Sequence, residues 1–232
     1  MTVHRFFVDP AELGGDRFPL PAAIAHQVTR VLRLHSGEQL VLLDGAGMAL
    51  TCRLDGGECV VESRERAGGE PVYRLIVWQA LLRGDHVEEV VRHGTELGVA
   101  EFRLFTSERC VAREPSTARL DRLRTVAREA AEQSERGIIP PVAAPVPFGD
   151  VLAAATRSTV LLDARAEVPG LAGLAAPEGV VIGPEGGFTP DEVADAERAG
   201  LVIASLGERV LRSETVAVAA AAVILSRTGD FA

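Results

Sequence analysis

Two glycine-bearing turns in the last third of the chain are the residues best suited to bind a ligand. The first turn, residues 183–188 (GPEGGF), follows the apolar run 180–182, and the second, residues 207–212 (GERVLR), follows the apolar run 201–206. Glycine lets backbone N–H groups approach a ligand closely, and such groups suit an adenine edge, a carboxylate or a phosphate. The two turns therefore predict one pocket built mainly from backbone, although residues 183–187 could also be a plain strand-to-helix connection.

The side chains available for chemistry are restricted, because the chain has no lysine and its permanent positive charges are all arginines. This excludes a Schiff-base lysine, a lysine general base and the lysine of a P-loop. The glycine-rich dinucleotide fingerprint and the G-x-S-x-G nucleophile elbow are also absent from the sequence. His86 and His93 are two helical turns apart, too far to share one metal ion, so no metal site is predicted.

Composition indicates a cytoplasmic protein that does not use a membrane. No apolar run reaches the roughly 18 residues of a membrane span, and the N-terminus has charges and a proline where a signal peptide would be apolar. The three cysteines, Cys52, Cys59 and Cys110, are odd in number and show no CxxC spacing, which is typical of reduced thiols. The net charge of −9 argues against a non-specific polyanion binder, so any RNA must contact local arginine patches.

The positioning elements divide the chain into two predicted domains. Residues 1–71 are predicted to form a small β-barrel that docks a partner, with one amphipathic helix over residues 21–34. Its strands are expected at residues 5–8, 39–43, 48–54 and 58–62.

Residues 72–232 alternate strands and helices, which predicts an α/β domain whose parallel sheet is covered on both faces. Strands are expected at residues 73–81, 101–105, 159–162, 180–182 and 201–206, and helices at 85–97, 117–135, 151–155, 190–199 and 213–227. Thr189 and Glu192 are spaced as a capping box for one of these helices. Ligands in such sheets lie beyond the carboxyl ends of strands, where Asp163, Gly183 and Gly207 fall.

Six short motifs occur in order along nearly the whole chain. They are residues 30–33 (RVLR), 95–99 (TELGV), 107–110 (SERC), 132–136 (EQSER), 182–187 (IGPEGG) and 206–215 (LGERVLRSET). With this series the chain resembles the RsmE family of SPOUT-class methyltransferases. That family methylates N3 of a uridine in 16S ribosomal RNA of the small subunit, using S-adenosylmethionine. The chain departs from the family at His93, where relatives often carry a lysine.

The resemblance implies a fold, partners and a cofactor. It implies an N-terminal PUA-like or OB-like β-barrel (residues 1–71) and a C-terminal SPOUT domain (residues 72–232) with a parallel sheet and a deep trefoil knot. It also implies a homodimer with the pocket near the subunit interface, a cofactor, S-adenosylmethionine, and no metal or membrane. The alanine-rich helix 213–227 could pack on a second copy, but burial within one subunit would account for its composition equally well.

The resemblance also assigns roles to individual residues. The cofactor-binding residues are Leu161, Leu162, Asp163, Ile182, Gly183, Pro184, Glu185, Gly186, Gly187, Leu206, Gly207, Val210, Leu211 and Arg212. Arg109, Arg136 and Arg212 are candidate catalytic cations for a uracil anion. Glu132, Glu185 and Glu214 are candidate bases, with ion pairing or helix capping as the alternative for each. Arg5, Arg30 and Arg33 are expected to contact the RNA backbone.

Two other functions remain open at this point. The chain could be a SPOUT enzyme that acts on transfer RNA, although the N-terminal barrel with its RVLR motif argues against this. It could also be a non-catalytic RNA-binding or ribosome assembly factor of the same fold.

Overall fold

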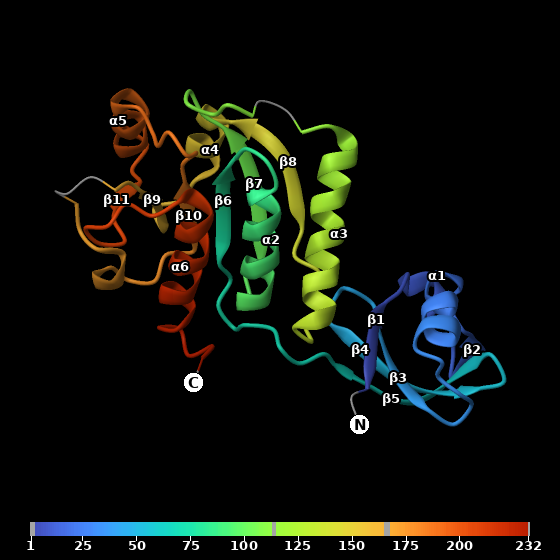
Figure 1. The fold of residues 1–232 in the computed structure, drawn as a ribbon. Coiled ribbons are helices and arrows are strands. Elements are labelled where there is room, and N and C mark those ends of the chain that lie inside the picture. Colours follow the sequence, from blue (N-terminus) through green and yellow to red (C-terminus); the bar gives the residue numbers. More distant parts are fainter. Residues whose placement is uncertain (1–2, 113–114, 165–167, 232) are drawn as a thin grey trace. The chain divides into compact units, whose positions relative to one another are not determined.

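The chain forms two compact units in a computed structural model that describes residues 3–112, 115–164 and 168–231. The smaller unit comprises residues 1–70 and 131–139, and the larger comprises residues 71–130 and 140–232. Figure 1 labels the helices and strands of both. Among the residues that the structure describes, every helix is too short or too polar to cross a lipid bilayer.

A five-stranded sheet organises the smaller unit, with strand order β1-β3-β4-β5-β2. The first strand pair is parallel and the others are antiparallel. The strands are β1 (His4–Phe7), β2 (Arg17–Pro19), β3 (Gln39–Leu43), β4 (Met48–Asp55) and β5 (Glu58–Arg66). A 3-10 turn, Pro10–Glu12, precedes β2, and α1 (Ala22–His26) continues into the π-helical turn Gln27–Val31, where a regular helix was expected.

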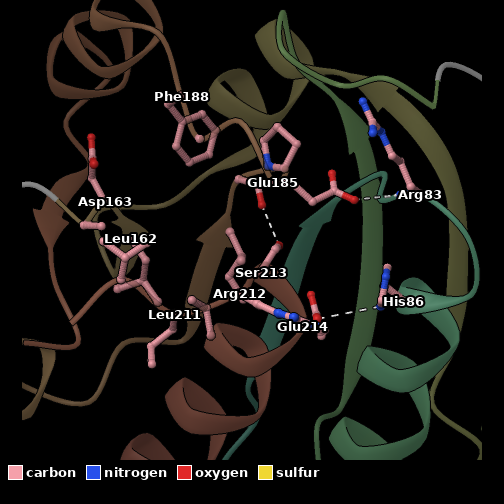
Figure 2. Close-up of a pocket in the computed structure, with 17 residues that line it drawn as sticks. Arg83, His86, Leu162, Asp163, Glu185, Phe188, Leu211, Arg212, Ser213 and Glu214 are labelled. Carbon is pink, nitrogen blue, oxygen red and sulfur yellow. Dashed lines mark hydrogen bonds and ion pairs between the residues drawn. The ribbon is translucent and has the colours of Figure 1, made fainter.

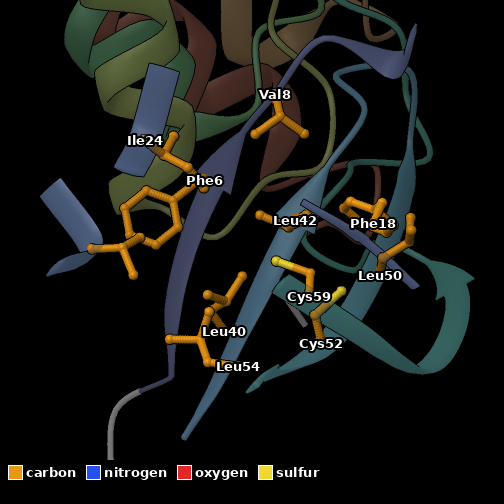
Figure 3. Packing of buried hydrophobic residues seen from close by; sticks show 11 residues of the cluster. Phe6, Val8, Phe18, Ile24, Leu40, Leu42, Leu50, Cys52, Leu54 and Cys59 are labelled. Atoms are coloured by element: carbon orange, nitrogen blue, oxygen red, sulfur yellow. The ribbon is translucent and has the colours of Figure 1, made fainter. Parts of the chain in front are cut away.

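Alternation of side chains along the strands gives this sheet two apolar faces. On one face Phe6 and Leu42 pack with Ile24 of α1 (Figure 3). On the other face the neighbouring residue Phe7 packs with Ala131, so the returning segment 131–139 covers that side. The backbone N–H of Phe7 also donates to Glu132 at 3.0 Å.

A six-stranded sheet organises the larger unit, and all its strands are parallel, which confirms the predicted parallel sheet. The strand order is β11-β9-β10-β6-β7-β8. The bounds are β6 (Ile76–Ala80), β7 (Glu101–Thr106), β8 (Val142–Pro147), β9 (Thr159–Leu162), β10 (Gly179–Ile182) and β11 (Val202–Ala204).

Helices lie on both faces of this sheet. On one face α2 (His86–Leu97) packs beside α6 (Ser213–Leu225), and α3 (Thr117–Gln133) lies beside α2 through an Arg122–Glu88 ion pair. On the opposite face the Phe148 ring of α4 (Phe148–Ala154) contacts Phe105 and Phe188. Helix α5 (Pro190–Arg198) packs against β11, and a 3-10 turn, Leu171–Gly173, precedes β10.

The capping box predicted for α5 is confirmed, and it also holds a second loop. The Thr189 hydroxyl accepts from the N–H of Glu192 at 3.2 Å, and the Glu192 carboxylate accepts from the N–H of Thr189 at 2.9 Å. The same carboxylate accepts from the N–H of Glu108 at 2.8 Å. One buried carboxylate therefore fixes both the start of α5 and the loop after β7.

Candidate functional site

A cleft of about 570 Å³ opens at the carboxyl ends of β6, β9 and β10 (Figure 2). Its lining comes from the loop after β6, the ends of β9 and β10, and the turn that leads into α6. The lining residues are Arg83, His86, Leu162, Asp163, Ala164, Ile182, Gly183, Pro184, Glu185, Gly187, Phe188, Val210, Leu211, Arg212, Ser213, Glu214 and Val216. This volume is within the range of small-molecule sites, and the position is the usual one in open parallel sheets.

The turn after β10 is fixed in place by a buried polar chain. The Ser213 hydroxyl, at the start of α6, donates to the Gly183 carbonyl at 2.6 Å. The side-chain N–H of Gln79, on β6, donates in turn to the Ser213 hydroxyl at 3.0 Å. Gln79 and Ser213 are both buried, so water does not compete with these bonds. Three elements that build the cleft are thereby tied to one backbone carbonyl.

Two glycines of this turn have physical reasons to be glycine. Gly187 has a φ of +67°, which other residues rarely adopt, and its N–H closes a turn onto the Pro184 carbonyl at 2.9 Å. A Cβ on Gly183 would lie 2.9 Å from the ring of Phe188. That ring stacks on Phe105 with centroids 6.3 Å apart, so the sheet core supports the turn from below.

The cleft has an apolar wall and a charged edge. Leu162, Ile182 and Leu211 form part of the wall. The acidic residues Asp163, Glu185 and Glu214 and the basic residues Arg83 and Arg212 line its edge. The Glu185 carboxylate accepts from the backbone N–H of Arg83 at 2.9 Å, which joins the β10 turn to the loop after β6.

The second glycine turn borders a smaller hollow of about 40 Å³. This hollow shares Leu162, Asp163 and Leu211 with the cleft, so the two spaces adjoin each other. Gly207 has a φ of +100°, and a side chain there would meet nothing within 4 Å. Glycine is therefore favoured at this position by the backbone conformation and not by a lack of space for a side chain.

The structure brings most of the predicted cofactor-binding residues together. All of them line the cleft except Leu161, Gly186, Leu206 and Gly207. Leu206 and Gly207 line the smaller hollow, and Leu161 is buried within β9. Gly186 is exposed, and its carbonyl accepts from Arg109 at 3.0 Å.

The predicted catalytic residues lie in three different surroundings. Arg212 lines the cleft, whereas Arg109 donates to the carbonyls of Gly186 and Phe188, at 3.0 and 3.2 Å, and so braces the β10 turn. Arg136 and Glu132 belong to the smaller unit, where Arg136 is buried and pairs with Glu70 at 2.8 Å. A catalytic role for Arg136 and Glu132 stays a prediction.

The three predicted RNA contacts lie in the smaller unit. Arg5 pairs with Glu135 at 3.3 Å. Arg30 and Arg33 are exposed, and Arg33 has a φ of +54°, so the chain turns sharply at this motif.

Arg83, His86, Phe188 and Ser213 also line the cleft, although no site role was predicted for any of these four side chains. Arg83 and His86 follow β6, and they reach the cleft because β6 lies beside β10 in the sheet. The available signal was the Gly84-Asp85 pair at the carboxyl end of a predicted strand. That pair indicates a cleft residue only when the order of the strands in the sheet is known, and the sequence pattern does not specify this order.

One group of potential metal ligands lies at the edge of the cleft. Nδ1 of His86 is 3.9 Å from Oε1 of Glu89 and 3.7 Å from Oε1 of Glu214. Among the described residues, these three side chains form a group whose ligand atoms all lie within 4.8 Å of one another. His93, two turns further along α2, is exposed and outside the group.

Comparisons with known proteins agree with this geometry. Residues 69–225 match the family model of an RNA methyltransferase domain. The chain is 34% identical to ribosomal RNA small subunit methyltransferase E of Synechocystis, over 97% of this chain and 78% of that protein. It is 35% identical to the protein of the same name from Mycobacterium tuberculosis, over 98% and 94%.

A solved structure supports the same relationship. The structure of ribosomal RNA small subunit methyltransferase E from Neisseria gonorrhoeae, bound to S-adenosylmethionine, is similar to this chain with a TM-score of 0.87. It is 28% identical, and the similarity covers 97% of this chain and 98% of that one.

Proposed function

The chain belongs to the RsmE family of RNA methyltransferases, and we propose that it uses S-adenosylmethionine to methylate N3 of a uridine in 16S ribosomal RNA of the small subunit. The observation that supports this most is the cleft at the carboxyl ends of three parallel strands, lined by most of the residues that the family resemblance assigned to the cofactor. The relative from Neisseria gonorrhoeae binds S-adenosylmethionine.

The cleft residues fit that cofactor chemically. S-adenosylmethionine is an adenosine with a positively charged sulfonium group, and it supplies the methyl group. The apolar wall of Leu162, Ile182 and Leu211 suits the adenine ring, and the turn backbone offers groups to its polar edge. Asp163, Glu185 and Glu214 place three carboxylates around the cleft, which favours a cationic ligand.

The chain's own residues contribute mainly position and charge. The buried Gln79–Ser213–Gly183 chain and the Arg109 brace fix the turn after β10. Rigid placement of the acceptor supplies a large part of the rate in a transfer between two bound groups. Arg212 is the cleft cation placed to stabilise negative charge on the uracil oxygens, and Glu185 and Glu214 are the cleft carboxylates able to accept the N3 proton.

The proposal extends to the trefoil knot of the SPOUT class. Support comes from the residues beside β11. Ser205 exchanges backbone hydrogen bonds with Pro169 and Leu171, at 3.0 and 2.8 Å, while Asp163 donates to Ala204 at 2.9 Å. The chain leaving β11 is thus flanked by both arms of the segment that joins β9 to β10, as a threaded strand would be.

The proposal also includes an N-terminal β-barrel that binds the RNA. The register between β4 and β5 shifts at Thr51 and Cys52, where Glu62 of β5 is an extra residue, and a bulge of this kind bends its strand, as closure of a small barrel requires. Arg5, Arg30 and Arg33 of this unit would contact RNA phosphates.

A homodimer is part of the proposal. Helix α6 carries small residues on its partly exposed side, among them Ala219 and Ala222, and these permit close packing with a second copy. Light scattering coupled to size-exclusion chromatography, on the full chain at micromolar concentration, is expected to give twice the chain mass of 24.6 kDa.

Mass spectrometry of ribosomal RNA tests the function. Cells that lack this gene are expected to lose 3-methyluridine from 16S ribosomal RNA, and purified protein with S-adenosylmethionine is expected to restore it on isolated small subunits. Asp163→Asn at the cleft should reduce restoration, whereas Asp150→Asn at an exposed position of α4 should not. Intact 3-methyluridine in the deletion strain would refute the proposal. Methylation of transfer RNA would favour a SPOUT enzyme that acts on transfer RNA. RNA binding that does not depend on S-adenosylmethionine would favour a non-catalytic RNA-binding or assembly factor.

A further inference from the structure

The edge of the cleft brings three metal-ligating side chains together from two helices. His86 is the first residue of α2 and Glu89 lies one turn along the same side, while Glu214 is in the first turn of α6. Figure 2 shows His86 and Glu214 facing one another at the end of the cleft beside Arg83. We name His86, Glu89 and Glu214 the rim triad.

Hydrogen bonding does not account for the geometry of the rim triad. The two imidazole-to-carboxylate distances, 3.7 and 3.9 Å, are too long for hydrogen bonds. Nδ1 of His86 is buried and has no hydrogen-bond partner among the described residues. Both of the triad's other groups present carboxylate oxygens to it, so a bare nitrogen lone pair would face negative charge. A positively charged species in the gap would satisfy all three groups.

The spacing suits a metal ion. Zn²⁺ holds imidazole nitrogen and carboxylate oxygen at about 2.0–2.2 Å, which puts two ligands of one ion roughly 3–4 Å apart. The two distances from His86 fall within that interval, and all three ligand atoms lie within 4.8 Å of one another. A set of one imidazole and two carboxylates suits divalent transition ions such as Zn²⁺ and Mn²⁺.

We propose that the rim triad binds one divalent transition-metal ion. Three protein ligands leave further coordination positions open to water or to a bound ligand, as in catalytic rather than structural sites. The ion would neutralise two carboxylates at the cleft edge of a chain whose net charge is −9. With less negative charge at this edge, RNA phosphates would approach the cleft more easily. This consequence rests on the proposed function, but the metal site does not.

Calorimetric titration of the tag-free full chain with ZnCl₂, and separately with MnCl₂, tests the site without cofactor or RNA. We expect one binding site for at least one of the ions. His86→Ala, Glu89→Gln and Glu214→Gln should each weaken binding tenfold or more. His93→Ala and Glu96→Gln, which remove an exposed imidazole and an exposed carboxylate from the same helix, should leave it unchanged.

Two results would overturn the site: binding of neither ion, or equal weakening by His86→Ala and His93→Ala. Glu89 is more than half exposed, so Glu89→Gln is expected to fold and keeps the test decisive if another variant does not. Because the measurement needs no methyl transfer, loss of the proposed methyltransferase activity would leave the metal result standing.

Discussion

At the scale of single residues, the Ser213 hydroxyl holds the cleft together. It donates to the Gly183 carbonyl at 2.6 Å and accepts from Gln79 at 3.0 Å in a buried setting. Ser213→Ala leaves a buried carbonyl without its donor, which costs about 1–3 kcal/mol. We expect the free energy of unfolding in urea to fall by that amount. Calorimetry should also show weaker binding of S-adenosylmethionine, because the turn after β10 is released.

Ser226→Ala provides the matched control at the other end of the same helix. Ser226 is exposed directly after α6, and its hydroxyl donates to the Val223 carbonyl at 3.1 Å. Removing an exposed hydroxyl of this kind changes stability by less than about 0.5 kcal/mol. If both variants lost the same stability and the same affinity, the buried chain through Ser213 would have no special role.

Glu101 makes the stability of the larger unit depend on pH. Burial by itself raises the pKa of Glu101, but hydrogen bonds and charge from Arg103 and Arg74 outweigh it and hold the pKa below its ordinary value. The folded state therefore binds this proton less tightly than the unfolded state. The resulting stability is present above the ordinary glutamate pKa of about 4.3 and is lost as pH falls through the lower folded pKa.

Glu101→Gln removes that pH-dependent contribution. We expect the free energy of unfolding of this variant to fall less steeply than that of the unsubstituted chain between about pH 5 and pH 3, as measured by urea denaturation. Parallel pH profiles for the two proteins would show that the Arg74–Glu101–Arg103 group does not act in this way.

At the scale of elements, the fit of α2 onto the sheet depends on one glycine. A Cβ on Gly94 would lie 2.7 Å from the ring of Phe102, which is fully buried on β7. Gly94→Ala therefore forces α2 and the sheet apart. Overpacking of this kind costs about 1–3 kcal/mol, more than the gain in helix propensity. We expect a lower urea midpoint with an unchanged slope.

Gly149→Ala on α4 is the control that separates the effect of side-chain packing from the effect of helix propensity. Gly149 is also helical, but a Cβ there would meet nothing within 4 Å. Alanine should then stabilise the chain by roughly 0.5–1 kcal/mol. Destabilisation by both substitutions would mean that the contact between Gly94 and Phe102 is not the cause.

Elements with a strong local signal were predictable from sequence, and others were not. The strands β3 and β9 have the predicted bounds, and Thr189 caps α5 as its spacing indicated. The strands β2 and β8 were missed because RFP and VAAPVP contain proline and lack a run of β-branched residues. These strands form only because a neighbouring strand pairs with them.

The candidate site was predictable to the same extent. Residues 182–185, 187 and 210–212 could be assigned to a pocket because the turn chemistry is local. Arg83 and His86 could not, since their place in the cleft depends on β6 lying between β10 and β7. Arg109 was predicted to be a catalytic cation, and its guanidinium group donates to the carbonyls of the adjacent turn.

At the scale of the whole molecule, a net charge of −9 makes RNA binding depend on where the arginines lie. Arg30 is exposed on the smaller unit, and no carboxylate of a described residue is within ion-pair distance of it. We expect Arg30→Ala to weaken binding to 16S ribosomal RNA. If Arg30 neutralises one phosphate, the slope of log affinity against log salt should become shallower by about 0.7–0.9.

Arg17→Ala is the control that distinguishes a local contact from net charge. Both substitutions remove one positive charge from the same unit and leave the whole chain equally negative. Arg17, however, already pairs with Asp55 at 2.7 Å and Glu58 at 2.5 Å. Its guanidinium group is therefore neutralised within the protein and is not expected to bind a phosphate. Filter binding from about 50 to 300 mM KCl should therefore give an unsubstituted slope for Arg17→Ala. Equal slopes for the two variants would mean that RNA responds to the overall charge, and the assignment of Arg30 would be lost.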